Sequence, residues 1–305
     1  MLKILCLCLS ATLQRTVHFS FFKDGEVNRS EKYTLHASGK AVNSARVLNQ
    51  LEKDCSTVLC PLGESHIDLF LNLALQDNIH IIPVKTPGTV RECWTLLDKT
   101  NECTTEVVCD EPVGEYDFAL SQSTLLGILE KELKNYDAFL FAGSCPKHWS
   151  DGLPSVIAKI IANSGKPFLA DFSGKNLRRV IDIFPPSIIK INENEFLDTF
   201  KLGDYLNENQ LKCAITEKSK ELKNIIVVTR GKNSVYAAES GEFVEFPVEK
   251  VRAVNTTACG DAFSAGFLYE YLSSRNFLES LAKGTWCAAR NAESSVPGSI
   301  IVDLM

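Results

Sequence analysis

Apolar residues along the 305-residue chain fall into two patterns, which predict two kinds of structure. Short continuous apolar runs are typical of parallel strands that are buried on both faces. They occur near the N-terminus and at residues 55–60, 79–84, 136–141, 167–170, 188–191 and 224–229. Segments with helical periodicity lie between them, at residues 38–53, 65–77, 121–134, 150–163, 174–182 and 277–294. Their alternation predicts an α/β fold with a mainly parallel sheet and helices on both of its faces.

The second pattern is an alternation of apolar and polar residues, with aromatics, outside this series. Residues 15–36 alternate around Asp24-Gly25, a dipeptide typical of hairpin turns. Residues 88–96 and 102–109 resemble two more strands of the same kind. Together these segments predict a small sheet outside the layered body, placed as a lid.

The N-terminal segment, residues 1–11, contains one lysine followed by a short apolar run. A secretory signal peptide begins in this way, but no clear small-residue cleavage site follows here. The run is too short to span a bilayer as a helix. A buried first strand is therefore the favoured interpretation.

Composition narrows the class of protein. Acidic residues outnumber basic ones, 38 to 32, which gives a net charge of −6, and no dense Lys/Arg run is present. Nucleic-acid binding is therefore not predicted, and an anionic ligand would need locally placed cations. The eleven cysteines include no C-x-x-C pair. This pattern favours free thiols in a reducing compartment, and so a cytoplasmic location, over a disulfide framework or a zinc site.

Residues 254–267 contain the strongest candidate chemistry. Small and hydroxylated residues precede Gly260 and Asp261, and an apolar helix then continues to about residue 272. A helix N-terminus with unblocked N–H groups is an anion site. An ionised Asp261 beside it would suit proton abstraction from a hydroxyl while the N–H groups hold a phosphoryl group. An ordinary helix start with an aspartate in its first turn fits equally well, so these residues alone leave both interpretations open.

Further polar residues follow the predicted strands. Gly143, Ser144 and Asp171 each lie just after a strand, as do Asn192 and Glu195. Ligands of such sheets bind outside the carboxyl ends of the strands. The chain contains no G-x-x-x-x-G-K-[ST], no G-x-G-x-x-G and no H-E-x-x-H. A P-loop, a dinucleotide fingerprint and a zincin site are thereby excluded.

Residues 255–263 and Ala265-Gly266 resemble the C-terminal signature of the PfkB/ribokinase family of sugar kinases, with Ala258-Cys259 in place of Gly-Ala. Residues 38–46 resemble the Gly-Gly-Lys-Gly-x-Asn-x-Ala-Arg motif of the branch that acts on hexose phosphates. The resemblance covers essentially the whole chain. It implies one ribokinase-like kinase domain, residues 1–305, with a three-layer αβα body and a β-sheet lid formed by about residues 14–36 and 87–112.

Within that family the chain is most similar to 1-phosphofructokinase and tagatose-6-phosphate kinase. This resemblance implies ATP- and Mg²⁺-dependent phosphorylation of a ketohexose monophosphate to the bisphosphate. It implies small-molecule partners only, with no nucleic acid and no membrane. An exposed β lid also makes a homodimer through the lid an expectation.

The resemblance also implies roles for individual residues. Asp261 would be the general base, and the backbone N–H groups of Ala258, Cys259 and Gly260 would stabilise the transferring phosphoryl group. The implied sugar-binding residues are Gln14, Gly39, Lys40, Asn43, Arg91 and Ser144, with Arg29 as a further candidate. The implied nucleotide-binding residues are Lys190, Asn192, Thr229, Gly231 and Asn291. Asn192 and Glu195 would organise the magnesium ion.

Several positions depart from the family pattern. Gln14 stands where the family has a sugar-binding Asp, and Cys93 replaces an Asn. An amide lacks the charge-assisted strength of a carboxylate, a difference on the order of 1 kcal/mol per hydrogen bond. Ala258 would be strained by about 1 kcal/mol if its position required a positive φ. Cys259, at a helix N-terminus, is a candidate for a lowered thiol pKa.

Two alternatives remain at this stage. One is a kinase of an unphosphorylated sugar or a nucleoside, against which Lys40 and Arg91 argue because an uncharged acceptor gives them no partner. The other is a catalytically weakened binding protein with the same fold. Gln14, Ala258 and Cys93 favour that second alternative, whereas an intact Asp261, Gly260, Asn192 and Glu195 oppose it.

Overall fold

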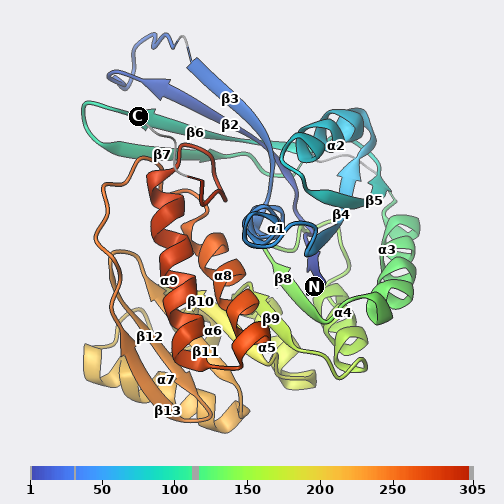
Figure 1. Cartoon of the computed structure of the whole chain (residues 1–305). Helices are drawn as coiled ribbons and strands as arrows, with labels where there is room; N and C mark the ends of the chain where they lie inside the picture. The colour runs from blue at the N-terminus through green and yellow to red at the C-terminus, as the bar shows by residue number, and fades with distance from the viewer. Residues whose placement is uncertain (1, 31, 112–116, 302–305) are drawn as a thin grey trace.

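In the part of the chain that the computed structural model describes, residues 2–30, 32–111 and 117–301, nine strands form one large sheet (Figure 1). Their order is β13-β12-β11-β10-β9-β8-β1-β4-β5. Seven strands run parallel, and β12 and β13 complete the sheet as an antiparallel hairpin. The strands are β1 Ile4–Leu7, β4 Ser56–Gly63, β5 His80–Thr86, β8 Ala138–Ala142, β9 Phe168–Asp171, β10 Ile188–Asn192, β11 Ile225–Arg230, β12 Asn233–Glu239 and β13 Glu242–Phe246.

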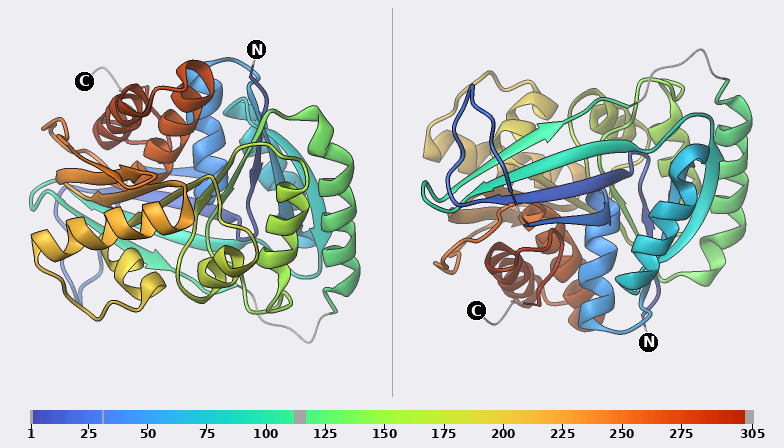
Figure 2. Two further views of the ribbon diagram at one scale, coloured as in Figure 1. Left: turned by 90° about the horizontal axis from the view of Figure 1, so that it is seen from below. Right: turned by 90° about the horizontal axis from the view of Figure 1, so that it is seen from above.

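Helices cover both faces of this sheet, as its continuous apolar strands predicted (Figure 2). One face carries α1 Lys40–Leu51, α2 Ile67–Gln76, α8 Cys259–Ser274 and α9 Phe277–Glu293. The other carries α3 Ala119–Glu132, α4 Leu153–Ala162, α5 Gly174–Ile183, α6 Glu193–Phe200 and α7 Glu208–Leu222. The 3₁₀ turns Glu64–His66 and Leu133–Asn135 adjoin α2 and α3.

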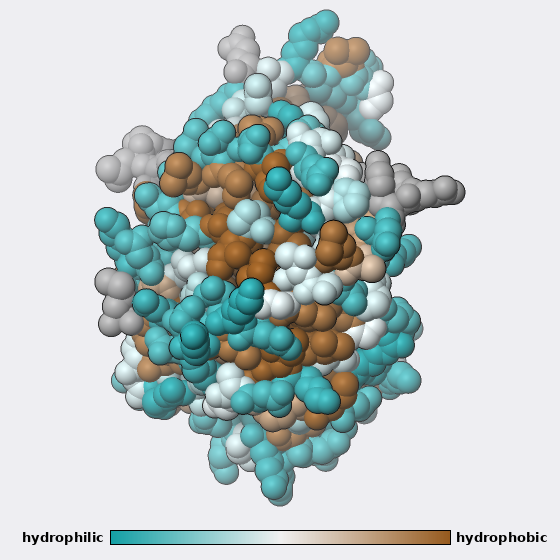
Figure 3. Space-filling view, turned by 90° about the vertical axis from the view of Figure 1, so that its right-hand side faces the viewer, coloured by the Kyte–Doolittle hydropathy of each residue, from teal (hydrophilic) through white to brown (hydrophobic). Residues whose placement is uncertain are grey.

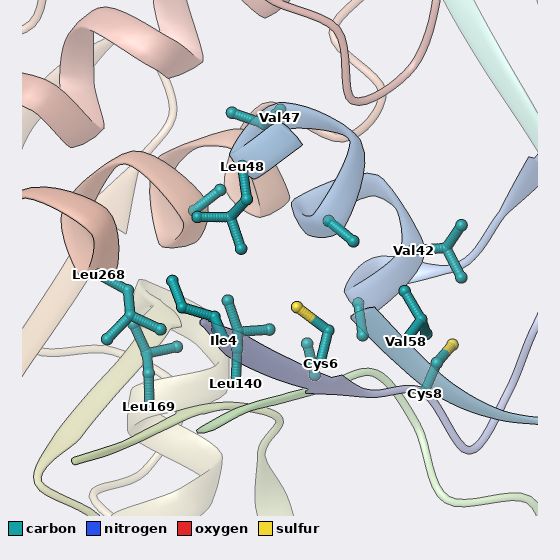
Figure 4. Close-up of a cluster of buried hydrophobic side chains, with 14 of the residues drawn as sticks. Ile4, Cys6, Cys8, Val42, Val47, Leu48, Val58, Leu140, Leu169 and Leu268 are labelled. Atoms are coloured by element: carbon teal, nitrogen blue, oxygen red, sulfur yellow. The ribbon is translucent and has the colours of Figure 1, made fainter. Parts of the chain in front are cut away.

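Strand β1 shows how one apolar run serves two cores. Ile4 and Cys6 join the cluster beneath α1 and α8, whereas Leu5 and Leu7 join the cluster beneath α3 to α7. Successive strand residues point to opposite faces, so a strand covered on both sides needs an apolar residue at every position. Figure 4 shows Ile4, Cys6 and Cys8 on the side of β1 that faces α1. The N-terminal run is thus the first strand that the sequence predicted.

A second sheet of four strands, in the order β3-β2-β6-β7, lies across one end of the body (Figure 1). Its strands are β2 Thr12–Phe19, β3 Lys32–Ser38, β6 Arg91–Asp98 and β7 Cys103–Val108. They fall within or beside the segments expected to form the lid, residues 14–36 and 87–112, of which 31 and 112 lie outside the described residues. We refer to this four-stranded sheet as the lid.

Strand β4 is longer than the sequence predicted. The prediction ended it before Pro61, but the strand continues through Pro61 to Gly63. Pairing with β1 stops at Leu59, so Pro61 has β5 as its only strand neighbour and its missing N–H interrupts no second ladder. At Gly63 a Cβ would lie 2.3 Å from the Thr89 backbone, so this close approach requires glycine.

One face of the surface is unusually apolar. Figure 3 shows brown side chains gathered over the side of the molecule that contains α2, β5 and α3. The exposed large apolar residues there include Leu69, Leu75 and Leu120.

Among the described residues, no helix has both the length and the hydrophobicity needed to cross a membrane. All eleven cysteines are free thiols in this structure.

Candidate active site

A cavity of about 430 Å³ lies between the lid and the carboxyl ends of the large sheet's central strands. The lid contributes Thr12, Gln14, Ser38, Arg91, Cys93, Trp94, Glu106 and Val108 to its lining. The body contributes Gly39, Lys40, Asn43, Lys190, Asn192, Glu195, Thr229 and residues 256–261. Most of the residues that the sequence singled out, from segments far apart in the chain, therefore line one cavity.

The loop before α8 turns sharply at Ala258, the N-cap residue, which adopts φ 67° and ψ 10°. This left-handed conformation costs a residue with a Cβ about 1 kcal/mol or more, which is why a glycine is the usual occupant. The turn directs the first N–H groups of α8 towards the cavity, where the helix dipole favours an anion. Lys190 adds a cation here, since a Cβ on Gly260 would lie 2.7 Å from its Nζ.

Asp261 lies in the first turn of α8 and is only 6% exposed. Its Oδ2 accepts a hydrogen bond from Asn43 Nδ2 at 2.9 Å, which joins α8 to the neighbouring helix α1. Burial, and then the negative charge of Asp171, raise the pKa of this carboxyl to about 7. Asp261 therefore exchanges a proton near neutral pH, as a general base requires.

Asp171, at the end of β9, has the opposite electrostatic environment. It is fully buried, and its carboxylate lies 2.9 Å from Lys190 Nζ and 3.1 Å from Lys40 Nζ. Ser264 donates a third bond to it at 2.7 Å. Burial alone would raise the pKa of Asp171, but Lys190 and Lys40 outweigh it and lower the pKa to about 2. Asp171 is thus a permanent anion that fixes both lysines beside the cavity.

Asn192 and Glu195 form a capping box at the start of α6. Asn192 Oδ1 accepts the Glu195 N–H at 2.9 Å, and Glu195 Oε2 accepts the Asn192 N–H at 2.8 Å. Glu195 Oε1 lies 3.5 Å from Lys40 Nζ. Asp171 and then Glu195 raise the pKa of Lys40 well above its ordinary value, so this lysine stays charged. Asn192 and Glu195 therefore both cap α6 and line the cavity.

The sugar-binding candidates from the lid and from α1 also meet here. Gly39, at φ 126°, begins α1, and a Cβ there would lie 2.9 Å from Cys8 Sγ, so the position requires glycine. Gln14 is buried in β2 and donates to Thr95 Oγ1 at 2.9 Å. Arg91 Nε lies 3.3 Å from the Glu111 carboxylate. The arginine thus lines the cavity with a carboxylate already beside it.

Four candidates do not line the cavity, and one of them, Arg29, is exposed in the segment between β2 and β3. Ser144 is exposed in the loop after β8, and Gly231 lies in the exposed turn between β11 and β12. Asn291 is fully buried in α9, where its side chain donates to Thr257 O at 2.8 Å and to Cys259 Sγ at 3.3 Å. Its Oδ1 accepts the N–H groups of residues 298 and 299. Asn291 therefore positions the loop before α8 from behind.

The expected lowering of the Cys259 pKa is wrong. Burial, reinforced by the charge of Asp261, raises the pKa of this thiol to about 11, although Asn291 acts in the other direction. The helix N-terminus favours a thiolate, but loss of water around the sulfur disfavours it more strongly. Cys259 is consequently a protonated thiol near neutral pH.

Sequence reasoning missed several residues that shape this site. Thr257 Oγ1 donates to Glu106 Oε1 at 2.7 Å and lies 3.4 Å from Thr95 Oγ1. Glu106 and Thr95 sit opposite each other in the β6–β7 register. The alternation of the lid strands could have placed them on one face, but only the assembled fold brings that face against residue 257.

Comparison with known proteins identifies the family. The model of the pfkB family carbohydrate kinases matches residues 3–301. The chain therefore belongs to the pfkB family of carbohydrate kinases, and it is a sugar kinase by family. The resemblance noted in the sequence is confirmed.

Solved structures confirm the ribokinase-like α/β fold. Phosphofructokinase-2 from Escherichia coli, in its tetrameric inhibited form, superimposes with a TM-score of 0.85 at 16% identity, over 96% of this chain and 94% of that chain. A possible 1-phosphofructokinase from Thermotoga maritima gives 0.86 at 18% identity, over 96% and 93%. Ribokinase from Thermotoga maritima gives 0.75 at 21% identity, over 99% and 96%. At these identities the likeness establishes the fold alone.

Proposed function

We propose that this protein transfers the γ-phosphoryl group of ATP to a hydroxyl group of a sugar acceptor. The observation that supports this most directly is Asp261, a buried carboxyl with a pKa of about 7, in the first turn of a helix whose N-terminus faces the cavity. A general base works best when its pKa lies near the working pH. Phosphoryl transfer otherwise needs positioning and stabilisation of negative charge, which the N-terminus of α8 supplies.

In the proposed reaction, Asp261 takes the proton of the acceptor hydroxyl. The acceptor oxygen bonds to the γ-phosphorus, and the bond from that phosphorus to the β–γ bridging oxygen breaks, which releases ADP. Asn43 holds one oxygen of Asp261 and so leaves the other for the acceptor hydroxyl. Lys190, fixed by Asp171 beside Gly260, and the N–H groups of residues 258–260 stabilise the charge of the transferring group.

Asn192 and Glu195 are the residues that would hold Mg²⁺ with the ATP phosphates. Magnesium prefers oxygen ligands and is commonly bound by one or two carboxylates, phosphates and waters, and the amide and carboxylate oxygens of this pair meet that preference. Both residues line the cavity on the side of Lys190 and Thr229. Among the described residues, no group of three or more His, Cys, Asp and Glu side chains forms a complete protein cage. When bound, the ion neutralises phosphate charge.

For the acceptor, we propose a ketohexose monophosphate, as the family branch implies. Lys40 and Arg91 would then contact its phosphate. Both cations line the cavity, Arg91 from lid strand β6 and Lys40 from the start of α1.

One observation favours a second candidate, an uncharged acceptor. Lys40 lies near Asp171 and Glu195, and Arg91 lies near Glu111. Each cation therefore already has a carboxylate partner, and the argument that an uncharged acceptor would leave them unpaired no longer holds. A phosphate would have to compete with those carboxylates, whereas a neutral sugar or nucleoside would not.

The experiment that tests the proposed function is ADP release from ATP and Mg²⁺ with five acceptors: fructose 1-phosphate, tagatose 6-phosphate, fructose 6-phosphate, fructose and adenosine. Turnover with a ketohexose phosphate alone supports the first candidate, and turnover with fructose or adenosine alone supports the second. Absence of ADP release with all five contradicts a kinase for these acceptors. A sugar-induced rise in melting temperature without turnover would then indicate a binding protein.

Two further properties belong to the same proposal. We propose a homodimer through the outer face of the lid, where Tyr33 is 63% exposed and does not line the cavity. Size-exclusion chromatography with light scattering measures this directly, and Tyr33→Lys on that face should reduce the dimer. The free thiols are consistent with a cytoplasmic location, which we also propose.

A further inference from the structure

A line of polar side chains connects the lid to the loop before α8. Gln14 in β2 donates to Thr95 Oγ1 in β6 at 2.9 Å. That hydroxyl lies 3.4 Å from Thr257 Oγ1, which in turn donates to Glu106 Oε1 in β7 at 2.7 Å. Three lid strands and the phosphoryl-binding loop thus meet through side chains alone. Gln14, Thr257 and Glu106 line the cavity.

Glu106 is the one carboxylate among the described lid residues that line this cavity. A carboxylate accepts about four hydrogen bonds through its two oxygens, and Thr257 supplies one of them. Glu106 therefore has acceptor capacity on the side where an acceptor sugar would lie. A sugar presents several hydroxyl donors, and hydrogen bonds from hydroxyls to a carboxylate are stronger than those to a neutral amide.

Gln14 supplies less of this chemistry than a carboxylate would. Its amide group donates to the Thr95 hydroxyl, and only its carbonyl oxygen is an acceptor. Glu106 lies at the other end of the same hydrogen-bonded line, and the Thr257 hydroxyl orients it. Bonds that fix a side chain before binding reduce the entropy lost when a ligand arrives.

We propose that Glu106 binds a hydroxyl group of the acceptor and is a specificity-determining residue of the lid. This inference rests on the proposed function. Because the carboxylate is negative, it disfavours a phosphate at this point and selects the hydroxyl-bearing end of the acceptor. Thr257 lies next to Ala258, so the same contact links acceptor binding to the loop that receives the phosphoryl group.

The test is Glu106→Gln, which keeps the shape of the side chain and removes its charge. With the acceptor that turns over, the KM for that acceptor should rise about tenfold, while the KM for ATP stays within about twofold. Glu92→Gln is the matched control. Glu92 is also a lid glutamate, but it pairs with Arg15 at 3.1 Å and does not line the cavity, so both KM values should stay unchanged.

Thr257→Val separates a binding role for Glu106 from a merely structural one. It removes the hydrogen bond to Glu106 but keeps the carboxylate. If Glu106 binds the acceptor, Glu106→Gln raises the acceptor KM more than Thr257→Val does. Equal changes in acceptor KM and in melting temperature would show that Glu106 only holds the lid, and would overturn the inference.

If the enzyme is active, two other results overturn the inference. One is an acceptor KM that is unchanged in Glu106→Gln. The other is an acceptor KM that is lowered in Glu106→Gln, because the negative charge would then repel the acceptor. If the wild-type protein turns over none of the five acceptors, the proposed function fails first. The inference is then tested by the rise in melting temperature that each acceptor causes without ATP. Loss of this rise in Glu106→Gln supports the inference; its retention, or its absence from the wild type, overturns it.

Discussion

Two buried aspartates at the site have pKa values that are shifted in opposite directions. Asp171 is fully buried beside two lysines, and its pKa is lowered to about 2. Asp261 is also buried, but there burial and the negative charge of Asp171 outweigh Lys40, Lys190 and the Asn43 hydrogen bond, and its pKa is raised to about 7. Burial acts on both carboxyls in the same sense. The difference therefore comes from the charge of their neighbours.

The two aspartates therefore have different roles. Asp171 fixes Lys40 and Lys190 and does not change protonation near neutral pH. Its negative charge also helps to raise the pKa of Asp261. Neighbouring groups that push two pKa values apart are a common way to separate a structural anion from a proton-transfer group.

The largest expected effect on activity comes from replacing Asp261, the aspartate whose pKa lies near neutral pH. Asp261→Asn keeps the side-chain size but cannot accept a proton, so kcat should fall on the order of 10³-fold. Steady-state ADP release measures this change, and ATP binding followed by calorimetry should be nearly unaffected. Retention of more than about a tenth of the wild-type kcat would show that Asp261 is not the base.

Replacing Asp171, which is paired with two lysines, should mainly lower the stability of the protein. Asp171→Asn leaves Lys190 buried without its anion, and the free energy of unfolding should fall by about 3 kcal/mol. Urea denaturation followed by circular dichroism measures it. Asp137→Asn is the matched control, because Asp137 is an exposed aspartate just before β8 that accepts one backbone hydrogen bond from Lys3 and should change stability by less than about 0.5 kcal/mol. Equal values for the two variants would contradict the assigned role of Asp171.

The two carboxyls also predict opposite pH dependences. With Asp261 at about 7, kcat/KM should rise about tenfold per pH unit below that value and level off above it. For stability, the ionised Asp261 is disfavoured in the folded state, so its cost appears as pH rises from about 4 to 7. Asp171 contributes stability above its ordinary value of 3.8 and loses it as pH falls towards 2.

Comparing Asp261→Asn with the wild type from pH 4 to pH 8 isolates the first of these stability terms. The variant should become progressively more stable relative to the wild type as pH rises through this window. A difference that is constant with pH would mean that the Asp261 pKa is not raised in the folded protein.

The smallest expected effect concerns the turn that presents Asp261. Ala258→Gly relieves a left-handed alanine and should raise the free energy of unfolding by up to about 1 kcal/mol. Ala262→Gly, four residues on and inside α8, is the control and should lower it by about 1 kcal/mol or more. Thermal denaturation distinguishes the two. A loss of stability in Ala258→Gly would show that the alanine side chain contributes more than its conformation costs.

Much of this fold could be predicted from the sequence because local pattern determines it. The apolar strands, the helical segments between them and the lid strands follow from periodicity, and the start of α8 follows from small residues before Asp261. Strand ends were less predictable. Pro61 was interpreted as the end of β4, but whether a proline is tolerated depends on which neighbouring strand continues beside it.

Within the site, the sequence indicated which residues lie together but not which side chains they contact. Lys40 and Asp171 are 131 residues apart in the chain, and their ion pair follows only from the assembled sheet. The same holds for Thr257 and Glu106, 151 residues apart. Arg46, part of the motif that resembles the hexose-phosphate branch, is buried and bonds to Pro297 O and Asp77, so its role is structural. Side-chain partners decide these roles, and no local pattern encodes them.

The connectivity of the lid has a consequence for the order of folding. Its outer pairs, β2–β3 and β6–β7, are hairpins of nearby residues, whereas its central pair, β2–β6, joins Thr12 to Arg91 in parallel. Closing a loop of that length costs conformational entropy, and the loop contains α1, β4, α2 and β5. The two hairpins can therefore form early, but they join only after this part of the body has folded. Amide protons between β2 and β6 should gain protection after those of β1 and β4.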